Sequence, residues 1–516
     1  MPLQSPWKSP PICGISKAFF IFLLRNCNFY DILIVWVIVT DLTERTEAAV
    51  VTTPIYDYLV QYSRKGDLRM HMPGHKGKGL DHWLAAAYPL DITEICGADS
   101  LYEADGIIAE SEHNAAELFG AGATLYSAGG STLCIQAMLM QMKREGRTIL
   151  AGRNVHRSML NTCILLDLPV RWMYPRDGAL LSGAVSAQSV QFALANCRTP
   201  ACVYLTTPDY LGSMADIAAI AAICKRHNAR LVVDNAHGAH LAFVTPSLHP
   251  IALGADFCCD SYHKLLPALT GAACLHCKDP ADAPALRSAM AMFGSTSPSY
   301  LIMASMDLCN RYLDNQVRHD LATTARRLER MRNHLHKKFV FRRGDPFHVC
   351  ICAGESGYRG TMLAAWLVQQ GIMYEYADAD YVVLLCSPKT PLQDIETLEQ
   401  VLERCDLPKT VNPLRYEPPK ATALFAAMTP KEAAAQPVEM VPVSAAVGRI
   451  CAMTQPPCPP AVPIAICGEQ LNEAAVSLLL YYGVTEIAVV KEKKPPSDDL
   501  SDLLGTYTTK GTGIQS

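Results

Sequence analysis

The sequence has 516 residues, of which 50% are hydrophobic and only 18% are charged. This length suffices for about three domains, and the small charged fraction argues against long disordered stretches. A formal net charge of −4 gives no electrostatic footprint for nucleic acid or anionic lipid, and 20 cysteines are too few for a disulfide scaffold, so we expect a reduced, cytoplasmic, globular protein.

The two ends of the chain differ in composition from the middle. Residues 1–45 contain two apolar runs, at 18–24 and 32–39, but Arg25 and Asp31 interrupt them. A membrane-spanning helix needs about 20 uninterrupted apolar residues, so we expect no membrane anchor. We interpret 1–45 as an N-terminal extension outside the folded unit; a short helix packed on the domain or on a partner is the alternative. The polar residues 491–516 are expected to form a mobile tail.

Between residues 46 and 310 the pattern alternates between short apolar runs and amphipathic segments. Ser131 and Asp216 are placed to cap two of the helices. The runs are apolar throughout rather than at every second residue, which is typical of strands covered on both faces. We therefore predict an α/β large domain with about seven mostly parallel strands, near residues 124–127, 148–150, 170–174, 202–206, 231–234, 255–259 and 272–275.

Two smaller units are expected after the large domain. A long charged helix at 318–338 opens a small α/β domain over residues 311–415, with strands near 348–352 and 381–385. A C-terminal α+β domain follows over 416–490 and contains a proline-rich loop at 456–463. The pair Cys274 and Cys277 has no second CxxC to complete a zinc ribbon, so we predict no metal site.

A glycine turn after the first predicted strand could bind an anion. Residues 127–132 read SAGGST, so Gly130, Ser131 and Thr132 combine a tight turn, a helix start and two hydroxyl donors. The N-terminus of a helix favours negative charge, which makes this turn a candidate phosphate site. On its own the signal is weak, because Gly-Gly-Ser is also an ordinary turn with a helix cap.

Three further polar residues follow predicted strands of the same sheet. Asp234 ends one strand and could hold a protonated ring nitrogen, or could simply cap a turn. Lys264, next to His263, lies just beyond the strand at 255–259, where burial would make its amine nucleophilic. His156 follows the strand at 148–150 and could stack on an aromatic ring. Together with the phosphate turn, these residues fit pyridoxal phosphate.

The motifs closely resemble those of the Orn/Lys/Arg decarboxylase family, whose fold is the aspartate-aminotransferase-like one (fold type I). The resemblance extends from about residue 53 to 490. It is carried by RMHMPGHKG at 69–77, DITE at 91–94, GST at 130–132, NVHRS at 154–158, DNAHG at 234–238, SYHKLL at 261–266, TSPSY at 296–300 and PIAICGE at 463–469.

The resemblance implies roles for individual residues. Lys264 would carry the pyridoxal phosphate, Asp234 would pair with its pyridine nitrogen, and His263 would assist catalysis near phosphate and substrate. The acids Glu469 and Glu94 match positions that could meet the cationic end of a substrate. The loop at 296–300 matches one that approaches the neighbouring subunit, which implies a homodimer. The remaining cofactor-binding positions would be Gly130, Ser131, Thr132, His156, His237 and Ser261.

The implied reaction is decarboxylation of a small-molecule basic amino acid to an amine and CO₂, with arginine slightly favoured over lysine and ornithine, and a place in polyamine metabolism. An aminotransferase or lyase of the same fold remains an alternative, with Arg342, Arg343 and Arg359 as carboxylate clamps. A non-catalytic regulatory subunit is a third possibility. The chain departs from the family pattern at Cys96 and in the loop at 457–463, which leaves the substrate end of the site open.

Overall fold

The computed structural model describes residues 51–174, 185–417, 419–420, 423–454 and 462–492. The predicted extension at 1–45, most of the tail at 491–516 and most of the proline-rich loop at 456–463 lie outside these residues. None of the helices in the described ranges is both long and apolar enough to cross a membrane.

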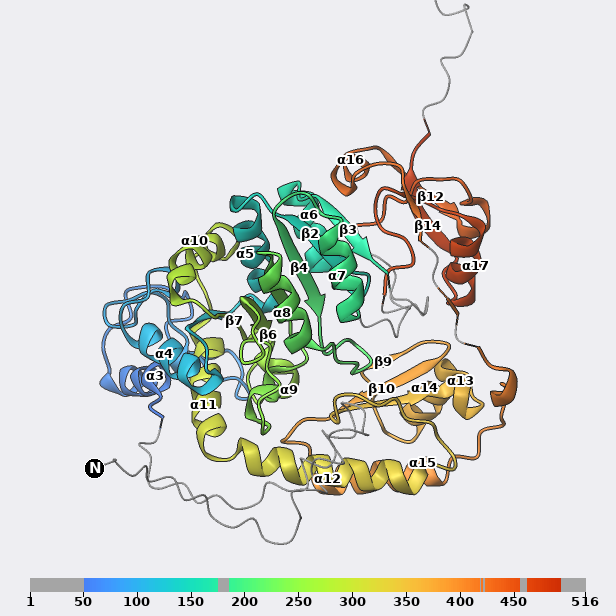
Figure 1. The fold of residues 1–516 in the computed structure, drawn as a ribbon. Helices are drawn as coiled ribbons and strands as arrows, with labels where there is room; N and C mark the ends of the chain where they lie inside the picture. The colour runs from blue at the N-terminus through green and yellow to red at the C-terminus, as the bar shows by residue number, and fades with distance from the viewer. Residues whose placement is uncertain (1–50, 175–184, 418, 421–422, 455–461, 493–516) are drawn as a thin grey trace, which may run out of the picture.

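A seven-stranded sheet forms the centre of the large unit (Figure 1), in the order β1-β7-β6-β5-β4-β2-β3. Strands β3, β2, β4, β5 and β6 run parallel, whereas β7 pairs antiparallel with both β6 and β1. Every predicted strand of this region is present, which confirms the α/β class. The strands are β1 (Ala123–Ser127), β2 (Thr148–Gly152), β3 (Val170–Met173), β4 (Ala201–Thr206), β5 (Arg230–Asp234), β6 (Phe257–Asp260) and β7 (Ala273–Cys277).

Helices pack around this sheet because each buries one apolar face. In α5, for example, Cys134, Ile135, Met138, Leu139 and Met142 are buried as their spacing predicts. The helices of this unit are α3 (Pro54–Lys65), α4 (Ile107–Phe119), α5 (Gly130–Arg144), α6 (Arg157–Leu166), α7 (Ala187–Ala195), α8 (Ile217–Arg226), α9 (Tyr262–Leu265), α10 (Ala283–Phe293) and α11 (Tyr300–Asn315).

The two predicted helix caps have different outcomes. Asp216 caps α8 by accepting a hydrogen bond from the backbone N–H of Ala219. The prediction for Ser131 is wrong, because α5 begins one residue earlier, at Gly130, and Ser131 lies inside its first turn. The Ser131 hydroxyl bonds the hydroxyl of Ser261 instead, at 2.7 Å. Ser131 is thus directed towards the start of α9, the helix that carries Lys264.

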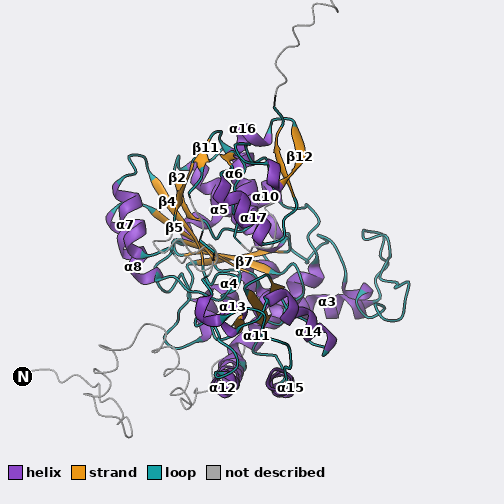
Figure 2. Cartoon of the chain, turned by 90° about the vertical axis from the view of Figure 1, so that its right-hand side faces the viewer, coloured by secondary structure: helices purple, strands orange, loops and turns teal. Residues whose placement is uncertain are grey.

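Two smaller units follow α11, and the predicted boundary at residue 310 falls inside that helix. In Figures 1 and 2 the long helix α12 (Val317–Leu335) lies beside α15 (Leu392–Glu403). They flank a three-stranded antiparallel sheet of β8 (His348–Cys352), β10 (Tyr381–Leu385) and β9 (Tyr376–Ala377). The short helices α13 (Ala353–Ser356) and α14 (Gly360–Gln369) complete this unit.

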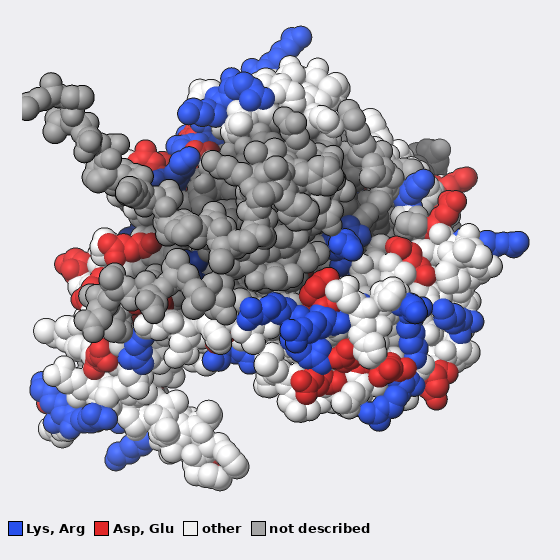
Figure 3. Space-filling view, turned by 60° about the horizontal axis from the view of Figure 1, so that its bottom comes forward, with Lys and Arg blue, Asp and Glu red and all other residues white. Residues whose placement is uncertain are grey.

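The C-terminal segment contains two two-stranded sheets, β11 with β13 and β12 with β14. It shares a buried cluster with the small unit, in which Cys350 and Tyr381 meet Val443 and Leu479. On the face shown in Figure 3, acidic and basic side chains are interspersed. The elements are β11 (Phe425–Ala426), α16 (Pro430–Ala434), β12 (Val438–Pro442), β13 (Glu469–Gln470), α17 (Glu473–Tyr481) and β14 (Glu486–Val490).

Candidate active site

The predicted site residues gather where parallel strands of the central sheet end. Strand β5 ends at Asp234, which lies opposite Cys259 on the parallel strand β6. One residue after Cys259, β6 itself ends, and Ser261 and α9 follow. Parallel strands finish at the same edge of a sheet, so Asp234 and Lys264 come together there although 30 residues separate them in the sequence.

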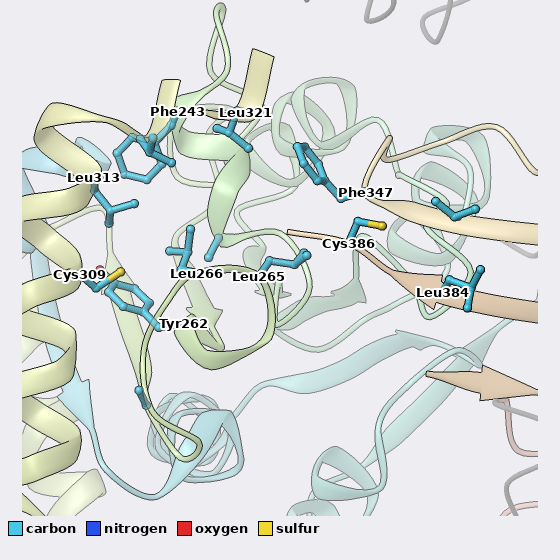
Figure 4. Packing of buried hydrophobic residues seen from close by; sticks show 14 of the residues in the cluster. Phe243, Tyr262, Leu265, Leu266, Cys309, Leu313, Leu321, Phe347, Leu384 and Cys386 are labelled. Atoms are coloured by element: carbon cyan, nitrogen blue, oxygen red, sulfur yellow. The ribbon is translucent and has the colours of Figure 1, made fainter. Parts of the chain in front are cut away.

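Hydrophobic packing fixes the short helix that carries Lys264. Tyr262, Leu265 and Leu266 are buried in one cluster that also contains Cys309 and Leu313 of α11, as Figure 4 shows. The same cluster reaches Phe347 and Leu384 in the small unit. Three anchored positions in five residues leave little freedom to the backbone of α9, so the lysine is held in place by its neighbours.

The Lys264 amine is partly buried, and its Nζ lies 2.9 Å from Nε2 of His237. Burial lowers the pKa of the amine, and the negative charges of Asp234 and Glu375 oppose this shift. Burial and the Lys264 charge lower the pKa of His237 well below its usual value, so the imidazole is neutral. A neutral imidazole can accept a hydrogen bond from the amine.

Asp234 is buried at the end of β5 and has several donors around it. The backbone N–H of Ala236 donates to its Oδ1 at 3.2 Å, and the Tyr204 hydroxyl donates to Oδ2 at 3.5 Å. Burial, together with the Asp234 charge, raises the pKa of Tyr204 well above its usual value, so this hydroxyl remains a donor. These bonds orient the carboxylate at the edge where the site lies.

His156 lies at the N-terminal end of α6 and shares the electrostatic environment of Asp234 and Lys264. Its Nδ1 contacts the hydroxyl of Ser158 at 2.7 Å. Water reaches part of the ring, yet the surrounding protein desolvates it enough to lower its pKa. The Asp234 charge opposes this shift and the Lys264 charge adds to it. His156 therefore lies near both predicted catalytic groups.

The predicted phosphate turn faces the group formed by Lys264, Asp234 and His156. Gly130 has φ +67°, a conformation that favours glycine, and open space lies where a side chain would be. Among the described residues no side chain caps α5, so N–H groups of its first turn remain for an anion. The paired hydroxyls of Ser131 and Ser261 and the exposed Thr132 add donors.

Two more predicted residues, His263 for catalysis and Glu94 for the substrate, have different surroundings. His263 is half-buried, and its Nδ1 contacts the carbonyl oxygen of Ala272 at 2.9 Å, which leaves Nε2 unprotonated in the neutral ring. Glu94 is exposed, and its charge adds to burial in raising the pKa of Tyr300. The structure thus places Glu94 beside α11, at the start of which Tyr300 lies.

The geometry does not support the predicted contact of Glu469 with a substrate. Its two carboxylate oxygens lie 2.6 and 3.1 Å from the guanidinium of Arg153, and the backbone N–H of Ile466 donates to one of them at 2.8 Å. Glu469 is only 3% exposed, so its carboxylate is not a surface group. The pair joins the C-terminal segment to the end of β2.

Glu375 is an acid near the site that the sequence did not reveal. It lies in the connection before β9, is exposed, and accepts a hydrogen bond from the hydroxyl of Tyr210 at 2.9 Å. The Tyr210 ring packs edge-on against His237, with 5.2 Å between the ring centroids. Glu375 is separated from Lys264 by 111 residues, and only the fold brings them together.

The described residues contain one group with metal-ligand chemistry. Atoms of His249, Cys258 and Asp260 lie within 4.8 Å of one another. His249 Nε2 already contacts Asp260 at 2.9 Å, and the Asn235 amide donates to the other oxygen at 2.7 Å. His249 and His276 lower the pKa of Asp260 despite its burial. The group therefore holds Asn235, next to Asp234, in position.

Two family models and several known proteins match this chain. The model of the Orn/Lys/Arg decarboxylase major domain matches residues 53–351, and that of the C-terminal domain matches 415–492. The arginine decarboxylase of Bacillus anthracis is 28% identical over 82% of this chain and 91% of its own length. That of Bacillus subtilis is 27% identical over 83% of this chain and 93% of its own.

The fold is similar to that of solved lysine decarboxylases. The enzyme of Francisella novicida superposes with a TM-score of 0.70 at 18% identity, over 86% of this chain and 81% of its own. The constitutive lysine decarboxylase of Escherichia coli gives a TM-score of 0.68 at 19% identity, over 86% and 82% of the two chains. Because the major-domain model alone matches more than half of its residues, this chain belongs to the Orn/Lys/Arg decarboxylase family.

Proposed function

We propose that this protein is a pyridoxal-phosphate-dependent decarboxylase of a basic amino acid, with arginine slightly favoured over lysine and ornithine. One observation carries the proposal. At one edge of the sheet the Lys264 amine contacts His237, and the charge of the Asp234 carboxylate acts on that amine. Family membership supports the reaction, and the arginine decarboxylases of Bacillus support the substrate class.

The donor set at this edge fits pyridoxal phosphate. Lys264 would hold the aldehyde carbon, Asp234 the ring nitrogen and His156 the ring face. The phosphate would lie at the N-terminus of α5, where the Ser131 and Ser261 hydroxyls meet and Thr132 adds a donor. When bound, the cofactor supplies an electron sink for the pair released from the bond to the carboxylate.

The protein's own groups would orient and protonate the reactants. Asp234 would hold a proton on the pyridine nitrogen of the bound cofactor, because a buried carboxylate favours a cation beside it. Lys264, or His263 once its Nε2 has taken up a proton, would then supply a proton to the substrate Cα after CO₂ has left. The site lies where the large and small units meet, since His237 of the large unit contacts His348 of the small one.

Glu375 offers the negative charge that a basic substrate requires. It faces the Lys264 amine closely enough to affect its pKa, and it is accessible to solvent. Its bond from Tyr210 orients the carboxylate while leaving one oxygen for a ligand. We therefore propose Glu375, rather than Glu469, as the partner of the substrate's distal cation.

A panel of arginine, lysine and ornithine, assayed with added pyridoxal phosphate, tests the reaction and the role of Glu375 together. We expect CO₂ and the amine from at least one substrate. We expect Glu375→Gln to raise KM for that substrate by about 10- to 100-fold, because a charge-assisted bond is lost. The matched control is Glu355→Gln, an exposed acid of α13. Formation of a keto acid without CO₂ would contradict the proposed reaction. An unchanged KM in Glu375→Gln would contradict the proposed role of Glu375.

Two predicted carboxylate clamps of an aminotransferase have other partners. Nε of Arg342 donates to the Ser213 hydroxyl at 2.9 Å. The guanidinium of Arg359 lies 5.2 Å from the ring centroid of Tyr481. Both contacts favour decarboxylation over transamination. The presence of the Lys264 amine and the Asp234 carboxylate also argues against a non-catalytic regulatory subunit.

We also propose a homodimer, because an apolar surface remains uncovered in the single chain. The segment after α3 exposes large side chains to water, and Figure 2 shows loops extending outward past that helix. Contiguous exposed apolar groups mark interaction sites, and a second copy of this chain would cover them. They are Leu68, Met70, Met72, Leu80, Trp83 and Leu84, between 60% and 94% exposed.

Trp83→Glu tests this dimer. Aromatic anchors commonly dominate an interface, so we expect the dimer dissociation constant to rise by about 30-fold or more. Sedimentation velocity over a range of protein concentrations measures it. Phe192→Glu, on α7 and 73% exposed, is the matched control and should leave the constant unchanged. A wild-type protein that stays monomeric at every concentration would refute the dimer.

The thiols support the expected cytoplasmic location. The 17 cysteines in the described part of the chain are all free, and most are buried. Unpaired thiols in such numbers are typical of a reducing compartment.

A further inference from the structure

A chain of hydrogen bonds leads from the Lys264 amine into the small unit. His237 contacts Lys264 through Nε2, and its Nδ1 lies 3.1 Å from Nε2 of His348. Nδ1 of His348 lies 2.6 Å from one oxygen of Asp345. Nε2 of His240 lies 2.8 Å from the other oxygen. We call His237, His348, Asp345 and His240 the histidine network.

The histidine network is shielded from water and spans two units of the fold. Its four members are at most 5% exposed. His237 and His240 follow β5 of the central sheet, whereas His348 begins β8 of the small sheet. Gly212 packs directly against His348, since an added Cβ there would lie 2.6 Å from the histidine's own Cβ. Buried bonds of this kind fix side-chain orientation, because no water can replace a lost partner.

The direction of each hydrogen bond in the network follows from its Asp345 end. An ionised carboxylate only accepts hydrogen bonds, so Nδ1 of His348 must carry a proton towards Asp345. In the neutral form of the His348 ring this is its single N–H, and its Nε2 is then an acceptor. His237 must then carry its proton on Nδ1, facing His348. Its Nε2 therefore presents a lone pair to the Lys264 amine.

We propose that His348 and Asp345 are positioning residues that hold His237 as the hydrogen-bond acceptor of Lys264. The inference rests on the proposed function only in giving the amine its catalytic task; the bonds themselves do not depend on it. Bonding of an N–H to His237 orients the amine and favours its ammonium form. The position of the small unit thereby affects the protonation of the lysine.

Other charged groups also face the two ends of this network. Asp234, Glu375 and His156 face the amine. At the far end, the Arg332 guanidinium donates to the backbone carbonyl of His348 at 3.2 Å. These groups are unchanged by a substitution at His348. A shift in the titration of Lys264 after such a substitution therefore reports on the histidine network.

Two variants of His348 separate the bond to His237 from the bond to Asp345. Asparagine carries an amide at the place of Nδ1, so His348→Asn still donates to Asp345 but does not reach His237. Glutamine is longer, so His348→Gln donates to Asp345 and also offers its oxygen to His237. Both variants satisfy Asp345, and both are expected to fold, which thermal unfolding checks.

The readout is the reactivity of Lys264 in the full chain freed of cofactor. Competitive acetylation at increasing pH, followed by mass mapping, gives the midpoint at which this amine becomes reactive, with the exposed lysines as internal reference. Without its partner on Nδ1, His237 can place its proton on Nε2 and favour the neutral amine. We expect the midpoint to fall by about one pH unit in His348→Asn, a tenfold change in the protonation ratio. We expect it to stay near the wild-type value in His348→Gln.

Three results would overturn the proposal: a wild-type midpoint in His348→Asn, an upward shift in that variant, or equal shifts in the two variants. Decarboxylation of arginine, lysine and ornithine is measured on the same preparations with pyridoxal phosphate added. Absence of CO₂ from the wild-type protein would refute the proposed function while leaving the acetylation result intact. The two failures are thus distinguishable.

Discussion

Lys264→Ala is expected to lower decarboxylation by on the order of 10⁴-fold or more, because it removes the nucleophilic amine of the site. The fold should survive, since Tyr262, Leu265 and Leu266 anchor α9 and remain unchanged. Thermal unfolding should therefore change little. Release of CO₂ from the best substrate of the panel measures the loss of activity.

Covalent attachment gives a second readout for Lys264. Borohydride reduction of the wild-type protein with pyridoxal phosphate should fix the cofactor on the peptide that contains Lys264, and mass mapping identifies it. Lys264→Arg is the matched control, since it keeps a positive charge but cannot form the bond. Near-normal decarboxylation by Lys264→Ala would refute the assignment of this lysine.

Asp234→Ala should weaken cofactor retention and lower the decarboxylation rate by about 100-fold or more, because the charge that keeps the pyridine nitrogen protonated is lost. Asp234→Asn separates charge from shape: the amide fills the same space at the end of β5 but carries no charge. Titration with pyridoxal phosphate, followed by its absorbance, gives the cofactor affinity, and single-turnover CO₂ release gives the rate.

The control for Asp234 is another aspartate of the same large unit. Asp216→Ala removes the cap of α8 and should cost about 1 kcal/mol of unfolding free energy without altering cofactor affinity. If Asp234→Asn binds the cofactor and turns over as the wild-type protein does, Asp234 has no role at the ring nitrogen.

Local sequence patterns predicted the elements of the central sheet well. Buried parallel strands are continuous apolar runs, and β2, β4 and β5 read in this way. That Asp234 and Lys264 lie close together could also be predicted, since both residues follow such strands and parallel strands end at one edge. Ser131 was misassigned because a serine at a helix start is usually a cap, and its true partner, Ser261, is 130 residues away.

Contacts between distant segments could not be predicted from the sequence. Glu469 follows a family motif and was expected to meet a substrate, but Arg153, 316 residues earlier, takes both its oxygens. Glu375 and His348 had no local signal, because an acid in a loop and a histidine in a strand are ordinary. Only the packing of the small unit against the central sheet gives them neighbours in the site.

The buried pair of Arg153 and Glu469 has a consequence for how this protein can be divided. Arg153 belongs to the loop after β2, and its guanidinium is surrounded by Trp172, Tyr174 and the carbonyls of the C-terminal segment. If that segment were cut away, the Arg153 guanidinium would lose both its neutralising carboxylate and its carbonyl acceptors. The large unit and the C-terminal segment are therefore separate in sequence but obligate companions, and neither is an exchangeable module.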